Sequence, residues 1–297
     1  MTAPVSMSAP VLRRTAHSLR RAVRFSQGGF TLVELIMVIV IIGVIGAVLS
    51  VFIRSPIDAY FDSARRAALT DVADTTLRRM TRDIRTALPN SLRQTSGTSP
   101  VNTQCIELIP TKAGGRYRAE ADVNGDGDVL RFDTPDDSFD MFRPNSTVAD
   151  QAIVAGDMVA IYNLGVLAAD AYAVLEPNVS VITEVGAGSL PNETKLRFSS
   201  MQFPLASGSN RFHIIPGNEK IVSYVCRDGS LYRNFNYAYT NSCPATGGDL
   251  IAKGATCTFV YNGSDLQRNA LVQIKLKLVS GDENVSLYQE VHVSNTP

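Results

Sequence analysis

Hydrophobic and polar residues follow three patterns along the chain, and the first is an unbroken apolar run. Residues 35–53 include no charged side chain in nineteen positions and consist mostly of Ile, Val, Leu and Met. A helix needs about 20 consecutive apolar residues to cross a bilayer. The run therefore predicts a membrane-spanning helix over residues 30–53.

The second pattern covers residues 54–89, where apolar residues recur every three or four positions with charges between them. They are Ile57, Phe61, Leu69, Val72, Leu77, Met80, Ile84 and Leu88. This spacing predicts that the helix continues as an amphipathic segment. Asp62 with Arg66 and Asp74 with Arg78 are i,i+4 pairs that support it. Pro56 is a candidate kink, and Pro89 ends the helix at Leu88.

The third pattern covers residues 90–297, where short β-prone runs alternate with Gly, Pro, Asn and Asp. The strands expected are 104–109, 129–133, 158–162, 181–184, 195–199, 212–215, 221–226, 231–234, 258–261, 270–279 and 285–293, the last two forming a hairpin. A Ser- and Thr-rich loop over 90–102 separates helix from sheet. The expected fold class is α+β, a long N-terminal helix packed on one large antiparallel β domain.

Charge around the apolar run predicts its orientation. Residues 1–29 carry five arginines and no acidic residue. Positive charge holds such a leader in the cytoplasm, so residues after 53 are expected on the far side of the membrane. The Gly-Gly pair precedes the apolar run, unlike the cleavage site of an ordinary secretory signal.

Glu34 is the one carboxylate beside this run. A lone carboxylate costs about 3 kcal/mol at the centre of a bilayer and less near its edge. A positive charge on a partner helix would offset that cost.

The segment Gly29-Phe30-Thr31-Leu32-Val33-Glu34-Leu35 resembles the signal of type IV pilins and of type II secretion pseudopilins. The resemblance implies that a prepilin peptidase cuts between Gly29 and Phe30 and that the new amino group of Phe30 is methylated. It also implies that this ammonium pairs with Glu34 of another subunit, which sets the register of stacked helices.

The whole chain has 28 basic and 28 acidic residues. Removing the five leader arginines leaves 23 bases against 28 acids, a net charge of −5, so nucleic acid is an unlikely partner. The four cysteines, Cys105, Cys226, Cys243 and Cys257, all lie in the exported part. One or two disulfides are expected there, and the three possible full connectivities stay open.

An acidic segment suggests a structural Ca²⁺ site. Asp122, Asn124, Asp126 and Asp133 occupy positions 1, 3, 5 and 12 of a calcium-loop pattern, and Asp128 would contribute its backbone carbonyl. The same residues also form a good turn sequence, and a twelfth-position Asp is a poorer ligand than Glu. Both interpretations stay open, and no other cofactor is expected.

The chain lacks the usual catalytic motifs, including G-x-S-x-G, a Walker loop and H-E-x-x-H, so no enzyme activity is expected. The acidic pair Asp136 and Asp137 lies in turn-like sequence. The basic segment 112–118 is interpreted as a turn with a solvated edge, in preference to a contact with an acidic partner or DNA.

Short motifs resemble the minor pilins of mannose-sensitive haemagglutinin (MSHA) pili, specifically the MshO family. They lie at residues 105–110, 114–118, 223–226, 231–233, 257–261 and 290–297. The resemblance implies a minor pilin of the inner membrane and then of the pilus surface, which initiates assembly or forms the tip, with surface attachment downstream. Its partners would be other minor pilins, the major pilin, the prepilin peptidase and the inner-membrane assembly platform. Two alternatives are a minor pseudopilin of a type II secretion system and a tip adhesin or ligand-binding module.

Overall fold

The computed structural model describes residues 29–96, 104–166, 169–173, 178–238, 242–262 and 269–297. It contains one long helix, α1 (Leu32–Arg85), followed by fourteen β-strands in the described residues. The chain divides into two compact units, one through Asp58 and the other comprising Ala59–Pro297. The expected α+β class, a long N-terminal helix packed with a large antiparallel β domain, is confirmed.

The helix ends at Arg85, three residues before the predicted end. Leu88 donates its backbone N–H to the carbonyl of Ile109 at 2.8 Å, and Ala87 forms a β-bridge with Pro110. After Arg85 the backbone therefore leaves the helix and pairs with Ile109 and Pro110, which directly follow the strand that ends at Leu108. The restriction that Pro89 places on Leu88 favours this extended conformation. The assigned helix continues through Pro56.

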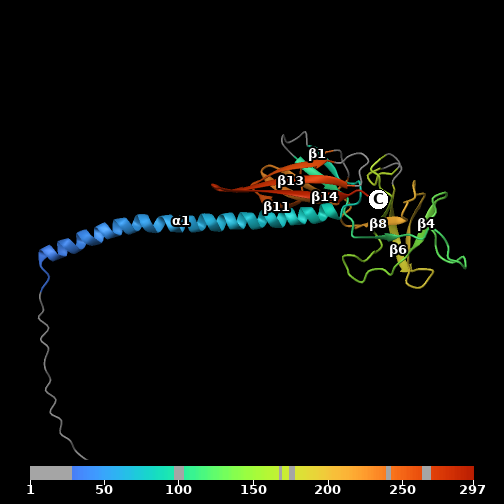
Figure 1. The fold of residues 1–297 in the computed structure, drawn as a ribbon, viewed down its shortest axis with the longest axis horizontal. Helices are drawn as coiled ribbons and strands as arrows, with labels where there is room; N and C mark the ends of the chain where they lie inside the picture. Colours follow the sequence, from blue (N-terminus) through green and yellow to red (C-terminus); the bar gives the residue numbers. More distant parts are fainter. Residues whose placement is uncertain (1–28, 97–103, 167–168, 174–177, 239–241, 263–268) are drawn as a thin grey trace, which may run out of the picture. The chain divides into compact units, whose positions relative to one another are not determined.

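Two sheets and the second half of the helix share one core, here called the helix core. The first sheet has the order β1-β2-β9-β10-β11 and the second β12-β13-β14, both antiparallel (Figure 1). The strands of the first sheet are β1 (Arg93–Ser96), β2 (Gln104–Leu108), β9 (Val222–Arg227), β10 (Ser230–Phe235) and β11 (Asp249–Lys253). Those of the second are β12 (Ala255–Asn262), β13 (Asn269–Ser280) and β14 (Glu283–Ser294).

The apolar positions that the sequence placed on one helix face do point into this core. Leu77, Met80 and Ile84 of α1 are buried against residues of both sheets, including Tyr224 and Ile274. At about 25 cal/mol per Å² of apolar surface, full burial of each such side chain contributes about 1.5–3 kcal/mol. This packing, rather than intrinsic helix propensity, holds the second half of α1 on the sheets.

Six strands form a separate antiparallel sheet of order β3-β8-β5-β6-β7-β4. They are β3 (Ala113–Arg116), β4 (Asp136–Met141), β5 (Met158–Ile161), β6 (Val179–Ala187), β7 (Thr194–Met201) and β8 (Arg211–Ile215). The chain just after β3 also bridges the end of β4, through Tyr117 and Met141, and Arg118 donates its N–H to the carbonyl of Asp140 at 2.9 Å. The sheet therefore closes on itself like a small barrel, which leaves few free edges.

Aromatic side chains fill the interior of this closed sheet, here called the aromatic core. Phe139 lies at its centre, with its ring centroid 5.2 Å from that of Phe212 and 5.9 Å from that of Phe198. All three side chains are buried. Edge-to-face and tilted ring pairs at these distances add to the free energy of burial.

Several predicted elements are wrong. Residues 129–133 form no strand, because Leu130 donates its N–H to the carbonyl of Arg118 and Arg131 donates to the carboxylate of Asp136. The predicted loop 90–102 contains β1, and the predicted basic turn 112–118 contains β3. The acidic pair Asp136 and Asp137 begins β4.

Candidate functional site

The segment Gly29-Phe30-Thr31 precedes α1 and is open on all sides within the described residues. Phe30 is 82% exposed, and a side-chain carbon built on Gly29 would meet no atom within 4 Å. Among the described residues, no side chain therefore covers the Gly29–Phe30 peptide bond, where the predicted cleavage falls.

Thr31 caps the first turn of α1. Its Oγ1 accepts a hydrogen bond from the backbone N–H of Glu34 at 3.3 Å, and Glu34 is the third residue of the helix. A negative side chain in the first turn also interacts favourably with the helix dipole. The sequence Thr-x-x-Glu is a capping-box pattern, so Thr31 is a residue that sequence reasoning overlooked and that a capping rule would have found.

Glu34 has no ion-pair partner among the described residues, and its side chain is exposed. The following apolar residues through Ile53 are exposed as well, including Ile36, Ile39 and Phe52. Contiguous exposed apolar surface of this size marks a lipid or protein contact. α1 is the one described helix that is long and apolar enough to cross a membrane. This surface and Glu34 together make the candidate assembly site.

Buried polar contacts hold the second half of α1 in place. Tyr224 of β9 donates its hydroxyl to Asp83 at 2.7 Å, and Arg233 of β10 reaches the same carboxylate at 3.3 Å. Arg233 also forms two hydrogen bonds to Glu219, at 2.9 and 3.0 Å, which lower the pKa of that carboxyl. Because these groups are mutually satisfied, they orient the helix on the sheet without leaving an unpaired buried charge.

The two i,i+4 pairs expected along the helix have different outcomes. Arg78 pairs with Asp74 at 2.6 Å as predicted. Arg66 instead reaches Glu283 of β14 at 2.9 Å, and Asp62 pairs with Arg65. Arg66 therefore links the helix to the β14 hairpin rather than to its own neighbour along the helix.

The residues predicted for calcium adopt a hydrogen-bonded turn. The carboxylate of Asp122 accepts backbone N–H groups from Asn124 at 2.9 Å and from Asp126 at 2.7 Å. These bonds lower the pKa of Asp122. Three of the five predicted ligands are thus brought into one turn.

The remaining two predicted ligands have other contacts or lie elsewhere. The carbonyl of Asp128 already accepts the N–H of Asp140, and its carboxylate binds Ser138 at 2.6 Å and Lys195 at 3.0 Å. Asp133 is exposed, with Thr134 as its side-chain contact. Among the described residues no three His, Cys, Asp or Glu side chains gather closely enough to hold a metal. Calcium binding here stays a prediction.

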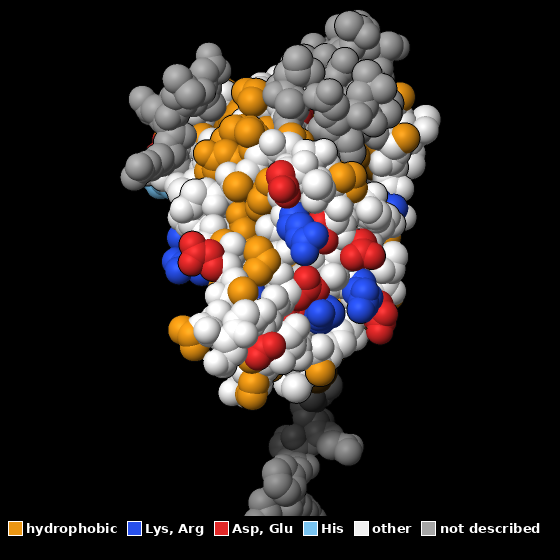
Figure 2. All heavy atoms as spheres, turned by 90° about the vertical axis from the view of Figure 1, so that its right-hand side faces the viewer, with side chains coloured by type: hydrophobic (Ala, Val, Ile, Leu, Met, Phe, Trp, Pro, Cys, Tyr) orange, Lys and Arg blue, Asp and Glu red, His pale blue; other side chains and the backbone are white. Residues whose placement is uncertain are grey.

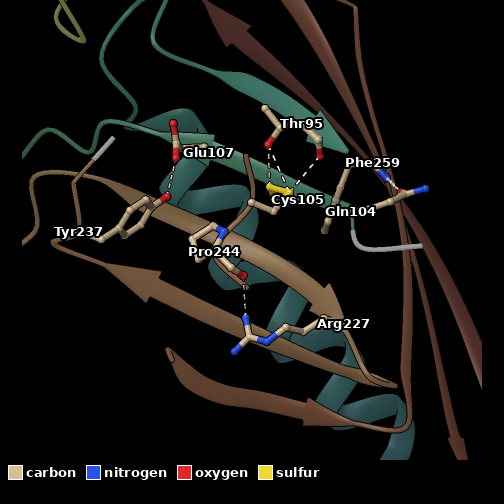
Figure 3. The surroundings of a disulfide bond; sticks show 9 residues. Thr95, Gln104, Cys105, Glu107, Arg227, Tyr237, Pro244 and Phe259 are labelled. Atoms are coloured by element: carbon tan, nitrogen blue, oxygen red, sulfur yellow. Dashed lines mark hydrogen bonds between the residues drawn. A yellow bond between two sulfur atoms is a disulfide. The ribbon is translucent and has the colours of Figure 1, made fainter. Parts of the chain in front are cut away.

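All four cysteines are paired. Cys105 of β2 is bonded to Cys243, with Cα atoms 5.8 Å apart, and Cys226 of β9 is bonded to Cys257 of β12, with Cα atoms 5.9 Å apart. The second disulfide joins the two sheets of the helix core. The first anchors the chain that precedes β11 onto β2, where Thr95 lies beside the sulfurs (Figure 3). The sequence left this connectivity open.

Comparison with known proteins bears on the N-terminus. The family described as Prokaryotic N-terminal methylation motif matches residues 24–50. No curated protein and no solved structure matches the chain significantly. The matched residues include Gly29, Phe30 and Glu34 and most of the apolar run.

The motif and the helix together support one class of protein. The chain carries a type IV pilin-like prepilin signal, which supports a pilin-like or pseudopilin-like protein. Proteins of this kind are structural rather than catalytic. The signal and the apolar helix are consistent with processing by a prepilin peptidase and with single-pass anchoring in the inner membrane.

Proposed function

We propose that the protein is a minor pilin of an MSHA-type type IV pilus that helps to initiate assembly or forms the tip complex. The observation that carries the proposal is the prepilin signal at residues 24–50, which leads into the first half of α1, where the apolar side chains through Ile53 are exposed. Such a surface is stable in lipid or in a bundle of like helices, and both environments occur along the route from membrane to pilus. Surface attachment would be the downstream result.

The charges near the N-terminus predict how the chain is oriented in the membrane and how it contacts a neighbouring subunit. The basic leader keeps the N-terminus in the cytoplasm, the apolar half of α1 spans the inner membrane, and the β domain lies in the periplasm. Cleavage after Gly29 and methylation then leave a positive charge on Phe30. In a bundle this ammonium would neutralise Glu34 of a neighbouring subunit, because each charge alone would be poorly solvated there. The pairing sets the axial register between subunits.

The large β domain favours a minor over a major subunit. Residues 90–297 give 208 residues beyond the helix, and a subunit present in few copies need not tile a filament. The short motifs that resemble MSHA minor pilins are the second support for this choice. Of their residues, Cys226, Leu231 and Cys257 lie in the helix core on β9, β10 and β12, and Cys105 on β2 packs in a separate cluster with Val225 and Cys243.

Deletion of the gene in the source cell tests the proposal. We expect few or no MSHA-type pili by electron microscopy, with normal secretion of exoenzymes, and recovery of pili with the wild-type gene. Retained pili together with trapped exoenzymes would instead identify a type II secretion pseudopilin. Immunogold label spread evenly along the shaft of complemented pili would contradict a tip role.

A further inference from the structure

The outer edge of β14 opens onto a groove beside α1. β14 is the last strand of its sheet, and it pairs on one side only, with β13. The groove has a volume of about 690 Å³ and lies between residues 287–289, in the middle of β14, and residues 74–86, at the end of α1. Both walls belong to the same compact unit of the chain.

The helix and the strand run side by side in the same direction. At the start of β14, Arg66 of α1 reaches Glu283 at 2.9 Å. Just after both elements end, the N–H of Asn90 donates to the side chain of Asn295 at 3.2 Å. The groove lies between these two contacts, where Figure 1 shows β14 next to the last turns of α1. An extended segment placed along β14 would therefore lie along α1 as well.

β14 lacks the features that usually protect an edge strand. Such strands are commonly short, interrupted by a bulge, or marked by Lys or Pro. β14 is 12 residues long, contains no Pro, Lys or Arg, and keeps a continuous register with β13. Within the described residues, the side chain that bonds to its backbone is its own Gln289, at the carbonyl of Glu290. The edge is therefore available for pairing with another strand.

The opposite edge of the same sheet is covered by side chains. In β12, the carbonyl of Phe259 accepts a hydrogen bond from Gln94 at 2.7 Å, and the N–H of Tyr261 donates to the same side chain at 2.8 Å. The N–H of Phe259 donates to Gln104 at 3.2 Å (Figure 3). Because these glutamines replace a neighbouring strand, the two edges of this sheet differ, and β14 is the open one.

The helix wall of the groove is basic. Arg78, Arg82 and Arg85 follow one another at spacings of four and three residues, so they share one helix face, and all three are exposed. Arg78 pairs with Asp74 at 2.6 Å, whereas Arg82 and Arg85 form no ion pair with any described residue. On the face of the molecule shown in Figure 2, by contrast, basic side chains lie among acidic ones. The groove thus offers positive charge without a matching acid.

The open edge and the basic wall together define one kind of partner. In β-strand addition, main-chain hydrogen bonds to a sheet edge provide affinity, and side chains at alternate positions provide specificity. A strand added about 4.8 Å from β14 would direct every second side chain toward α1. We propose that the groove binds an extended acidic segment of a partner polypeptide, which pairs with the outer edge of β14 and places carboxylates near Arg82 and Arg85. This contact uses neither Phe30 nor Glu34, so it does not depend on the proposed pilus role.

Fluorescence anisotropy with short labelled peptides and the full chain in micelles of a neutral detergent tests the proposal. The first probe alternates Val and Glu, and the second alternates Val and Lys. The third is the acidic peptide with every backbone nitrogen methylated, which keeps the charges but has no N–H to donate. We expect the first peptide to bind and the other two not to bind, because strand addition needs both the carboxylates and the backbone donors.

Variants of the two unpaired arginines test the basic wall. Arg82→Gln with Arg85→Gln should weaken binding of the acidic peptide at least about fivefold. Arg131→Gln with Arg143→Gln removes the same charge from two exposed positions outside the groove and should leave binding unchanged. Equal binding by the folded groove variant would overturn the proposal. So would no binding of the acidic peptide, or equal binding of the basic or methylated peptide, and these comparisons use the unaltered protein.

Discussion

The two disulfides differ in the length of chain that they close, and this difference predicts their contributions to stability. Cys105 and Cys243 are separated by 138 residues, and Cys226 and Cys257 by 31. Loop-closure entropy gives about 5 kcal/mol for the longer loop and about 3.7 kcal/mol for the shorter at 25 °C. We therefore expect removal of the Cys105–Cys243 bond to cost about 1.3 kcal/mol more.

The comparison uses two double variants that make the same chemical change. Cys105→Ser with Cys243→Ser, and Cys226→Ser with Cys257→Ser, each replace two buried sulfurs. The local cost of the serines is therefore similar, and the difference reports the loops. Equilibrium unfolding in guanidinium can be followed by tyrosine fluorescence, because the chain has ten Tyr and no Trp and every Tyr lies at residue 60 or later. Equal losses, or a larger loss for the shorter loop, would refute the reasoning.

Four further predictions follow from particular residues. Glu34→Ala should leave membrane insertion intact but reduce co-purification with other subunits, whereas Glu34→Asp should retain part of it; equal recovery of partners by all three proteins would show the carboxylate to be dispensable. Burial, with a smaller effect of Arg211, lowers the pKa of His213 to about 4, so the unfolded chain binds the proton more readily. Stability should be fully present above pH 6.5 and fall by about 2–3 kcal/mol as the pH drops to 4, and His213→Gln should flatten this dependence of Tm; an unchanged slope would contradict it. Gly115→Val should destabilise by about 1–3 kcal/mol, because a Cβ there meets ring carbons of Phe212 at 3.0 Å; Gly186→Ala, where nothing lies within 4 Å, is the control, and equal stability of both would count against the close approach. If the acidic turn binds calcium, a Ca²⁺ concentration of 100 times Kd should raise the free energy of unfolding by about 2.7 kcal/mol. This should appear as a rise in Tm with CaCl₂ that Asp122→Asn removes; an unchanged Tm would show that the segment is a hydrogen-bonded turn without calcium.

The elements that sequence reasoning placed correctly are those whose side chains alternate or recur by a simple period. In the hairpin of β13 and β14, residues 272, 274, 276 and 278 are buried on one face, and alternation predicts this directly. The spacing of three and four residues between Leu77, Met80 and Ile84 predicts in the same way that they share one buried helix face. Each of these elements turns one face toward a single core, so the spacing of apolar residues in the local sequence is sufficient to predict which residues are buried.

The strands that were missed depend on contacts far along the chain. β3 contains Gly114 and Gly115, which look like a turn, but side-chain carbons there would come within 2.9 Å of the carbonyl oxygen and 3.0 Å of the ring of Phe212. Glycine is thus required by close approach rather than by a turn. β4 contains an acidic residue, Asp140, that is buried because its carboxylate accepts hydrogen bonds from the backbone N–H groups of Asp128 and Ser189. Strand propensity cannot predict a strand that depends on such contacts.

The same difference between local and distant residues separates the candidate sites that could be predicted from those that could not. Gly29, Phe30 and Glu34 form a contiguous signal, and a short motif was enough to propose them. The disulfide pairs unite cysteines from distant segments, so their positions follow from topology. Four cysteines allow three full connectivities, and no spacing rule chooses among them.

Mass spectrometry of the mature N-terminus tests the central claim most directly. The protein, tagged at the C-terminus, would be purified from membranes of the source cell together with its companions, with Gly29→Glu as the unprocessed control. The account predicts an N-terminus at methylated Phe30, with MSHA-type minor pilins among the companions. Pseudopilin companions would assign the processed protein to a secretion system, and an intact leader in the wild type would contradict the pilin-like account itself.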